Sequence, residues 1–241
     1  MLRERFYPES RHGGFSAVDS TIAFYLRVRA LLAPDAVVVD AGCGRGTHDE
    51  EPTPTHRDLR TLRGRCARVI GLDTDPAAAG NRSIDEFRLV HDRHWPVDAQ
   101  SADLVLADFV LEHVADPDAF VAEAARVLRP GGALCLRTIN AWSYLGVASR
   151  LVPDRLHRRA LARLEPGRMA ADVFPTYYHC NTRRRLRRVL DRHGFDGVVL
   201  ARDSEPAYLA FSPLAYRLGV LHGRLAPAPL RVGLLAFGRR R

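Results

Sequence analysis

The stretch Val37–Gly46, VVVDAGCGRG, decides the fold of this chain. It begins with a short run of β-branched residues, which is typical of a strand buried on both faces of a parallel sheet. The run ends on Asp40, and Gly42, Gly44 and Gly46 follow in the next six positions. Glycine adopts backbone dihedrals that side chains forbid and lets the backbone approach a ligand closely. The stretch therefore predicts a buried strand followed by a ligand-binding loop.

Strands and helices alternate along the rest of the chain. Apolar runs of strand length predict further strands over residues 68–73, 87–91, 102–108, 133–139, 195–201 and 231–237. Helical spacing of apolar residues predicts helices over residues 18–32, 117–128, 154–164, 183–193 and 212–225. This alternation predicts an α/β fold with a mostly parallel sheet and helices on both of its faces. Ligands of such sheets bind beyond the carboxyl ends of the strands.

Proline, glycine and short polar residues set the expected limits of several elements. Pro52 and Pro54 are expected to break any helix soon after the glycine loop. The RPGG sequence at 129–132 predicts a turn. Asn181 or Thr182 is expected to cap the helix that follows it.

The composition is that of an ordinary globular protein. The chain has 241 residues, of which 46% are hydrophobic and 27% charged, and this suits one α/β domain with insertions. The four cysteines are scattered without metal-binding spacing, so no metal site is expected. The N-terminus lacks the apolar centre of a secretory signal, and no apolar run is long enough to span a membrane. We therefore expect a cytoplasmic protein with reduced thiols.

The charge is basic and unevenly distributed. All 36 basic residues are Arg, and the net charge is +8. Residues 1–140 contain 17 Arg and 21 acidic residues, whereas residues 141–241 contain 19 Arg and 7 acidic residues, a net charge of +12. A basic C-terminal part favours an anionic partner, such as a phosphorylated substrate, a membrane surface or a nucleic acid.

Acidic residues follow the predicted strands at the edge where a ligand would bind. Asp73 ends the second strand, and an acid there can accept hydrogen bonds from both ribose hydroxyls of an adenosine. Asp92 follows the third strand and can accept from an adenine amino group, and Asp108 ends the fourth. Asp40, which precedes the glycines, suits a cationic ligand such as an ammonium group. The loop pattern is GxGxG rather than the GxGxxG of dinucleotide-binding enzymes, which disfavours a dehydrogenase.

Together these motifs resemble the class I S-adenosylmethionine-dependent methyltransferases, specifically the small-molecule type related to ubiquinone and menaquinone methyltransferases. The resemblance rests on VVVDAGCGRG, VIGLD and ADFVLEHVADPDAFVAEAARVLRPGG, and covers roughly residues 35–140 and, more loosely, 174–200. It implies a Rossmann-like sheet of seven mostly parallel strands, with the last strand antiparallel and a lid inserted after the fifth. Residues 1–241 then form a single methyltransferase domain. Its expected parts are an N-terminal helical segment at 1–34, a cofactor-binding core at 35–140, an acceptor-side lid at 141–180, and a C-terminal helix with the last two strands at 181–241.

The resemblance also implies a site for S-adenosyl-L-methionine. The residues implied in binding it are Asp40, Gly42, Cys43, Gly44, Gly46, Asp73, Thr74, Asp92, Arg93, Asp108 and Phe109. In that reading the glycine loop lines the methionine end, Asp73 takes the ribose hydroxyls and Thr74 lies beside the adenine. Residues 92–93 lie at the adenine edge, and Asp108 and Phe109 flank the cofactor near its methyl group.

Methyl transfer is an in-line displacement, so much of its catalysis comes from positioning. A general base is needed only when the acceptor is a hydroxyl or a protonated amine. His113 and His179 are the candidate bases, and both also fit structural roles. The residues expected to floor an acceptor pocket are Asn140, Trp142 and Tyr144.

The helix predicted over 183–193 has apolar residues on one face and arginines on the other. This basic face is either solvated or attracts an anionic or lipid-linked acceptor, together with Arg150, Arg155, Arg158 and Arg159. Peripheral contact with a membrane fits the same charge.

Two other functions remain open at this point. A catalytically inactive S-adenosylmethionine-binding or regulatory protein would share the fold. A nucleic-acid methyltransferase fits the basicity, but ADFV stands after the fourth strand where an NPPY-like tetrapeptide would be expected, so no nucleic-acid partner is expected. The sequence leaves open the acceptor, the methylated atom (O, N or C) and the oligomeric state.

Overall fold

The computed structural model describes residues 2–151 and 175–241. The helix expected over 154–164 lies outside the described residues, as do Arg155, Arg158 and Arg159.

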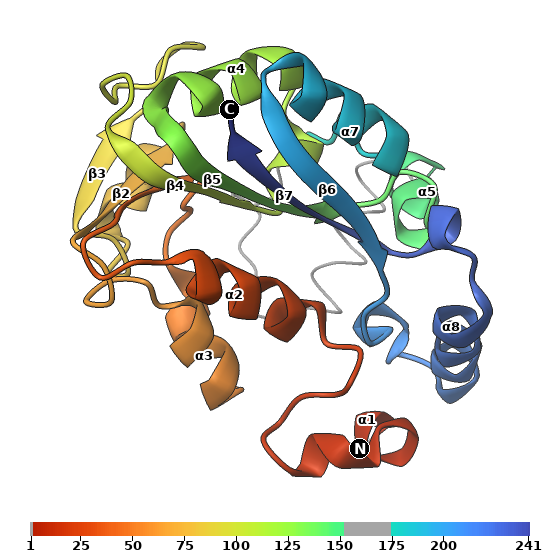
Figure 1. Cartoon of the computed structure of the whole chain (residues 1–241). Coiled ribbons are helices and arrows are strands. Elements are labelled where there is room, and N and C mark those ends of the chain that lie inside the picture. Colours follow the sequence, from red (N-terminus) through yellow and green to blue (C-terminus); the bar gives the residue numbers. More distant parts are fainter. Residues whose placement is uncertain (1, 152–174) are drawn as a thin grey trace.

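Within the described residues one sheet is formed (Figure 1). Its strands are β1 Val37–Ala41, β2 Arg68–Asp73, β3 Glu86–Leu89, β4 Ala102–Asp108, β5 Leu128–Ile139, β6 Phe195–Arg202 and β7 Gly233–Arg240. Their order across the sheet is β3-β2-β1-β4-β5-β7-β6. The first five pair in parallel, whereas β7 is antiparallel to both β5 and β6. The prediction of a Rossmann-like seven-stranded sheet with an antiparallel last strand is confirmed.

Helices lie on both faces of this sheet, as the alternation predicted. They are α1 Leu2–Phe6, α2 Ser20–Leu31, α3 Pro54–Arg60, α4 Pro117–Val127, α5 Tyr144–Leu151, α7 Arg183–Arg192 and α8 Pro213–Leu225. Short 3-10 turns are η1 Pro8–Arg11, η2 Thr47–Glu50, η3 Pro76–Gly80, η4 Leu111–His113, η6 Ala207–Leu209 and η7 Ala228–Leu230. In Figure 1, α2 and α3 cover one face and α4 and α7 cover the other.

The period-two alternation of the strands divides the core between these two layers. Val39 and Ile70 point to the face that carries α4 and α7, whereas Val38 and Val69 pack with α2. Both sets are almost fully buried. A sheet covered on both faces explains why its strands read as continuous apolar runs.

Two local expectations were wrong. Pro54 begins α3 rather than breaking a helix, because proline at the first helical position lacks only an N–H that has no intrahelical partner there. Residues 129–132 belong to β5 rather than to a separate turn. There the pairing of β4 with β5 shifts register between Ala102 and Leu104, and this irregularity accommodates the RPGG sequence within the strand.

The helix α7 is capped as expected at Thr182, whose side chain accepts a hydrogen bond from Arg185 N at 3.3 Å. Asn181 is instead buried, and its side chain bonds Thr138 on β5. No helix in the described part of the chain is long and apolar enough to cross a membrane. The same residues contain no group of His, Cys, Asp and Glu side chains able to hold a metal ion.

Candidate functional site

The carboxyl ends of β1, β2 and β4 bring the predicted site residues to one edge of the sheet. β1 pairs with β2 on one side, with Ala41 opposite Leu72, and with β4 on the other, with Asp40 opposite Leu106. The chain passes from β1 outward to β2 and β3 and then returns across β1 to β4. This reversal is the topological switch point at which open α/β sheets bind ligands.

The glycine loop, Asp40–Gly46, is fixed to the end of β2. The N–H groups of Gly42 and Cys43 both donate to Leu72 O, at 2.7 and 3.0 Å. Gly42 has φ +78°, and a Cβ at this position would lie 2.4 Å from Val110 Cγ2, so only glycine fits. A Cβ on Gly44 would meet no atom within 4 Å. The loop is therefore held rigidly, with open space above Gly44 for a ligand.

Asp73 is the residue to which this loop is tied. One of its carboxylate oxygens accepts from Gly44 N and the other from Asp75 N, both at 2.9 Å. A carboxylate oxygen has two lone pairs, so each retains the capacity for one further bond. Thr74 beside it is exposed. The geometry suits acceptance of hydrogen bonds from two neighbouring hydroxyl groups.

Asp40 is partly buried, and its carboxylate has no hydrogen-bond partner among the described residues. Burial raises the pKa of Asp40 to about 7, and the nearby charges of Asp108 and Asp73 add to this effect against the opposing charge of Arg60. A cation brought to this carboxylate would relieve the cost of its ionisation. Asp40 is therefore suited to a cationic ligand.

The raised pKa of Asp40 predicts a pH dependence of stability. Because the folded pKa is about 7 and the ordinary value 3.8, the folded protein retains a proton that the unfolded chain has lost between these values. The stabilisation is complete below the ordinary value and is lost as the pH rises through about 7. We expect Asp40→Asn to be more stable than the wild type at pH above about 7, measured by urea unfolding across this range. Identical pH dependence in both proteins would contradict this interpretation.

Asp108 is held in a buried ion pair, and its assignment to the cofactor site stays a prediction. Arg137 on β5 donates from Nε to one carboxylate oxygen at 2.5 Å and from a terminal nitrogen to the other at 2.6 Å. Tyr25 of α2 donates its hydroxyl to the second oxygen at 2.9 Å. Asp108 and Arg137 are 9% and 3% exposed. Burial alone raises the pKa of Asp108, but the charge and hydrogen bonds of Arg137 outweigh it, and the pKa lies below its ordinary value.

Phe109 is positioned by the same pair. Its N–H donates to Arg137 O at 2.8 Å, and its ring centroid lies 4.5 Å from the Arg137 guanidinium carbon. Its φ is +56°, a conformation that costs a phenylalanine energy and recurs at ligand sites. The ring is 42% exposed at the same sheet edge. Sequence reasoning assigned Asp108 and Phe109 but missed Arg137 and Tyr25.

Residues 92–93 follow β3, which ends at Leu89. Asp92 accepts from His94 N at 2.7 Å, and Arg93, which is 80% exposed, pairs with Asp116 at 2.8 Å. No hydrogen bond or ion pair among the described residues joins either one to the glycine loop. Their assignment to the adenine edge stays a prediction.

The two candidate bases each hydrogen-bond a backbone carbonyl and join residues 175–179 to η4 and the residues after it. His113 Nδ1 lies 2.8 Å from Pro175 O, and His179 Nδ1 lies 2.7 Å from Ala115 O. Since a carbonyl only accepts, Nδ1 of each histidine donates in these contacts. Both contacts are structural, and a catalytic function of either histidine stays a prediction.

A buried polar network beneath them was not anticipated. Thr138 Oγ1 donates to Glu112 at 2.6 Å and accepts from Asn181 Nδ2 at 2.5 Å. Glu112 is 3% exposed, and its burial raises its pKa to about 7. Its backbone carbonyl accepts from Tyr177 N at 2.7 Å. The signal in the sequence was a threonine and an arginine inside the apolar run of β5, because buried polar side chains require partners.

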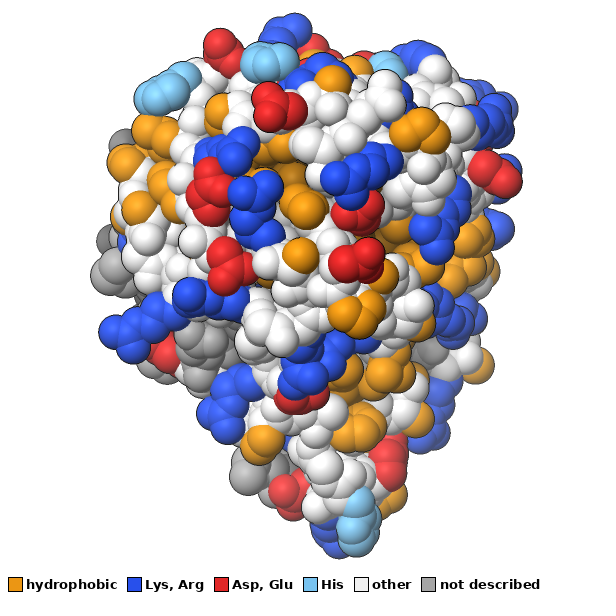
Figure 2. Space-filling model, turned by 60° about the vertical axis from the view of Figure 1, so that its left-hand side comes forward, with side chains coloured by type: hydrophobic (Ala, Val, Ile, Leu, Met, Phe, Trp, Pro, Cys, Tyr) orange, Lys and Arg blue, Asp and Glu red, His pale blue; other side chains and the backbone are white. Residues whose placement is uncertain are grey.

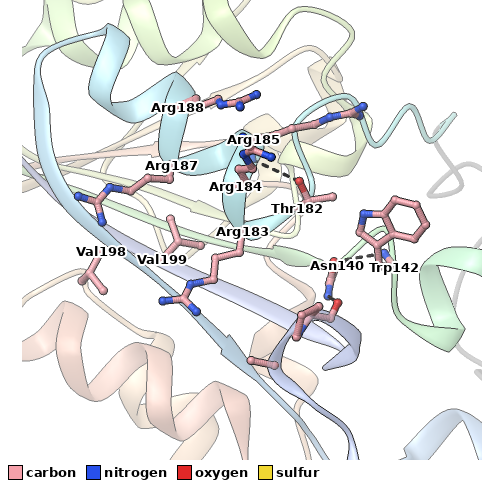
Figure 3. Close-up of a pocket in the computed structure, with 12 residues that line it drawn as sticks. Asn140, Trp142, Thr182, Arg183, Arg184, Arg185, Arg187, Arg188, Val198 and Val199 are labelled. Carbon is pink, nitrogen blue, oxygen red and sulfur yellow. Dashed lines mark hydrogen bonds between the residues drawn. The ribbon is translucent and has the colours of Figure 1, made fainter.

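A cavity of about 580 Å³ lies between α7, the edge strand β6 and the segment after β5 (Figure 3). The residues that line it are Asn140, Trp142, Thr182, Arg183, Arg184, Arg185, Arg187, Arg188, Val198, Val199, Ala228 and Pro229. Two of the three residues expected to floor an acceptor pocket, Asn140 and Trp142, are thus brought to one cavity. Tyr144 instead contacts the ring of His222, with centroids 5.3 Å apart. Arg150 donates to Gly146 O at 2.9 Å and is not a lining residue.

The strand order, the antiparallel last strand and the glycine loop at the switch point define the class I S-adenosylmethionine-dependent methyltransferase fold. Residues 11–200 match the family model described as a methyltransferase domain, and the chain belongs to this family.

The chain is also similar to other proteins of known sequence. The chain is 32% identical over 160 residues to an uncharacterized 37.1 kDa transposon protein of Streptomyces fradiae. This match covers 58% of this chain and 43% of that protein. It is 35% identical over 105 residues to a ubiquinone biosynthesis O-methyltransferase of Rhizobium leguminosarum bv. trifolii, covering 43% of this chain and 40% of that protein. The matches thus span less than half the length of these curated relatives.

Among solved structures, geranyl diphosphate C-methyltransferase from Streptomyces coelicolor A3(2), in complex with Mg²⁺, geranyl diphosphate and S-adenosyl-L-homocysteine, superposes with a TM-score of 0.58. The two chains are 20% identical, and the superposition covers 92% of this chain and 79% of the other. At this identity the similarity supports the fold alone.

Proposed function

We propose that this protein transfers the methyl group of S-adenosyl-L-methionine to a small-molecule acceptor that carries an anionic group. The observation that carries the proposal is the meeting of Asp40, the glycine loop and Asp73 at the switch point of the sheet. The loop offers open space above Gly44, and Asp73 retains acceptor capacity on both oxygens. These features fit an adenosine ribose at Asp73 and a cationic amino-acid end at Asp40.

The residues of the chain would bind and orient the cofactor. Asp73 would accept from the two ribose hydroxyls, and the carboxylate of Asp40 would neutralise the ammonium of the methionine end. The exposed ring of Phe109 would border the cofactor beside the glycine loop. When bound, S-adenosylmethionine supplies a sulfonium whose methyl group is electrophilic. Transfer then depends mainly on holding the acceptor in line with that group.

Cofactor binding should depend on pH through Asp40. With a pKa of about 7, its carboxyl group is largely protonated in weakly acidic solution and cannot neutralise an ammonium. We expect affinity for S-adenosylmethionine to rise about tenfold from about pH 5.5 to about pH 7.5. Isothermal titration across this range measures it, and Asp40→Asn should bind weakly with little pH dependence. A wild-type affinity that does not change over this range would contradict the assignment of Asp40.

The anionic group of the acceptor is proposed from the arginines of α7. Arg183, Arg184 and Arg185 occupy its first turn, which contains no acidic residue. Cations are disfavoured at this end of a helix because the macrodipole is positive there. Figure 3 shows Arg183 and Arg187 extending from α7 beside the apolar side chains Val198 and Val199. An anionic ligand with an apolar part would offset the unfavourable charges and cover the apolar wall.

Inorganic pyrophosphate is a direct probe of this cavity. We expect titration calorimetry to detect its binding to the wild type, and Arg183→Ser/Arg187→Ser to weaken that binding by about tenfold, because two charge-assisted contacts are lost. The double variant Arg27→Ser/Arg82→Ser removes two exposed charges elsewhere and should bind pyrophosphate as the wild type does. Equal losses in both double variants would show that only the overall charge acts.

The proposed reaction is tested by incubating the protein with methyl-labelled S-adenosylmethionine and quinone precursors, glycans, lipids or phenolic metabolites. Label transferred to one of these classes supports the proposal and identifies the acceptor atom. Binding of the cofactor without transfer to any class would favour the catalytically inactive, regulatory alternative.

A further inference from the structure

The helix α8 joins β6 to β7 and packs against the rest of the protein through one of its faces. Tyr216, Gly219 and Val220 form this buried face. A Cβ at Gly219 would lie 2.5 Å from Pro206 Cβ, so the helix lies close to the segment before it. The ring of Tyr216 contacts Phe6 of α1, with centroids 5.5 Å apart. α8 is therefore firmly attached although it stands apart from the sheet (Figure 1).

The opposite face of α8 is also apolar, and it is exposed. Leu214, Leu218, Leu221 and Leu225 follow one another at spacings of four, three and four, which places them on one side of a helix. Their exposed fractions are 66%, 57%, 50% and 72%, and Phe211 just before the helix is 68% exposed. These five residues are called the leucine stripe below. A contiguous exposed stripe of this kind marks an interaction surface.

The surroundings of the leucine stripe are basic. Arg217 and Arg224 lie on α8 beside it and are exposed. From residue 206 to residue 241 the sequence contains six Arg and no acidic residue. The nearest acids in sequence are engaged elsewhere: Asp203 accepts from Val232 N at 3.1 Å, and Glu205 lies 3.7 Å from Arg3. This differs from the face in Figure 2, where red acidic and blue basic side chains are interspersed.

We propose that the leucine stripe docks α8 on the surface of an anionic phospholipid membrane, with the helix axis parallel to the membrane plane. Leucines would enter the boundary between headgroups and acyl chains, and the flanking arginines would pair with lipid phosphates. Charge complementarity selects this occupant over a second copy of the chain. Arg217 and Arg224 lie on the same flank of the stripe, so a symmetric antiparallel contact between two stripes would bring these like charges together.

This attachment would place the arginine-lined cavity beside the membrane. His222 of α8 contacts Tyr144 of α5, which begins two residues after the cavity residue Trp142. Asn140, another lining residue, donates from Nδ2 to Pro229 O at 2.8 Å, close after the end of α8. Docking on lipid does not itself require methyl transfer, so the two proposals fail or succeed separately.

Sedimentation with vesicles tests the proposal. We expect the wild type to bind vesicles of equal parts phosphatidylglycerol and phosphatidylcholine, and to bind phosphatidylcholine vesicles at least about tenfold more weakly. Leu218→Ser/Leu221→Ser should weaken binding to the anionic vesicles by about tenfold or more, because two apolar side chains no longer enter the lipid. Leu26→Ser removes a leucine that is 53% exposed on α2 and should bind as the wild type does.

The proposal is overturned if the wild type does not bind the anionic vesicles, or binds neutral ones equally well. It is also overturned if the double serine variant binds as tightly as the wild type. A wild-type dimer in analytical ultracentrifugation that becomes monomeric in the double variant would assign the stripe to a second copy instead. Urea unfolding, expected to give free energies within about 1 kcal/mol of each other for both proteins, confirms that the variant is folded.

Discussion

Asp73→Asn is expected to weaken the binding of S-adenosylmethionine by about a hundredfold. The proposed carboxylate bonds to the ribose hydroxyls are charge-assisted, and losing about 1.5 kcal/mol from each of two gives a loss of this size. The substitution also affects the loop. The asparagine side chain has one oxygen and one NH₂ group, and the NH₂ group cannot accept, so one of the two hydrogen bonds from Gly44 N and Asp75 N is lost. Equilibrium dialysis with labelled S-adenosylmethionine at about pH 8, where Asp40 is ionised, measures the effect.

Asp75→Asn is the matched control for this substitution. Asp75 is two residues away and pairs with Arg45 at 2.8 Å, outside the proposed ribose contacts. We expect its affinity for the cofactor to stay within about threefold of the wild type, because the pair lies outside the proposed ribose contacts and its side chains keep partial access to solvent. If Asp73→Asn binds as tightly as Asp75→Asn, the ribose is held elsewhere.

Arg137→Met should cost about 3–5 kcal/mol of unfolding free energy, the largest stability loss we expect of any single substitution here. It removes both short charge-assisted bonds from the buried carboxylate of Asp108, and the Tyr25 hydroxyl at 2.9 Å and Arg60 at 3.9 Å do not replace them. The tie between Phe109 N and β5 uses the backbone of residue 137 and would persist. Urea unfolding of the wild type and the variant measures the change.

The double variant Arg137→Met/Asp108→Asn separates the cost of the orphaned charge from that of lost packing. A neutral pair of similar volume should recover most of the lost stability, because a buried ion pair contributes little over apolar replacements. If the unfolding free energy of Arg137→Met lies within about 1 kcal/mol of the wild-type value, the Asp108–Arg137 pair does not stabilise the fold as its burial indicates.

Much of the sheet was predictable because its strands are buried on both faces. The predicted strands over 68–73 and 102–108 have the observed bounds of β2 and β4. Their apolar, β-branched runs end on Asp73 and Asp108, and the parallel topology brings these ends together. The helix after Pro54 was missed because proline was taken only as a breaker, although it also starts helices.

The contacts that shape the site could not be predicted from local pattern. Asp108 bonds Tyr25 and Arg137, which lie 83 and 29 residues away in the sequence. In the sequence, only the position of Arg137 inside the apolar run of β5 indicated that a buried acidic partner was needed. The leucine stripe shows the same limit: the spacing of apolar residues predicted α8, but not that the protein buries the opposite face.

The most direct test of the proposed cofactor site is isothermal titration of the full chain with S-adenosylmethionine at about pH 8, above the pKa of Asp40. We expect saturable binding of one molecule per chain, no binding of NADH, and a loss of affinity in Asp73→Asn. Absence of saturable binding, or equal binding of NADH, would contradict the assignment of this site.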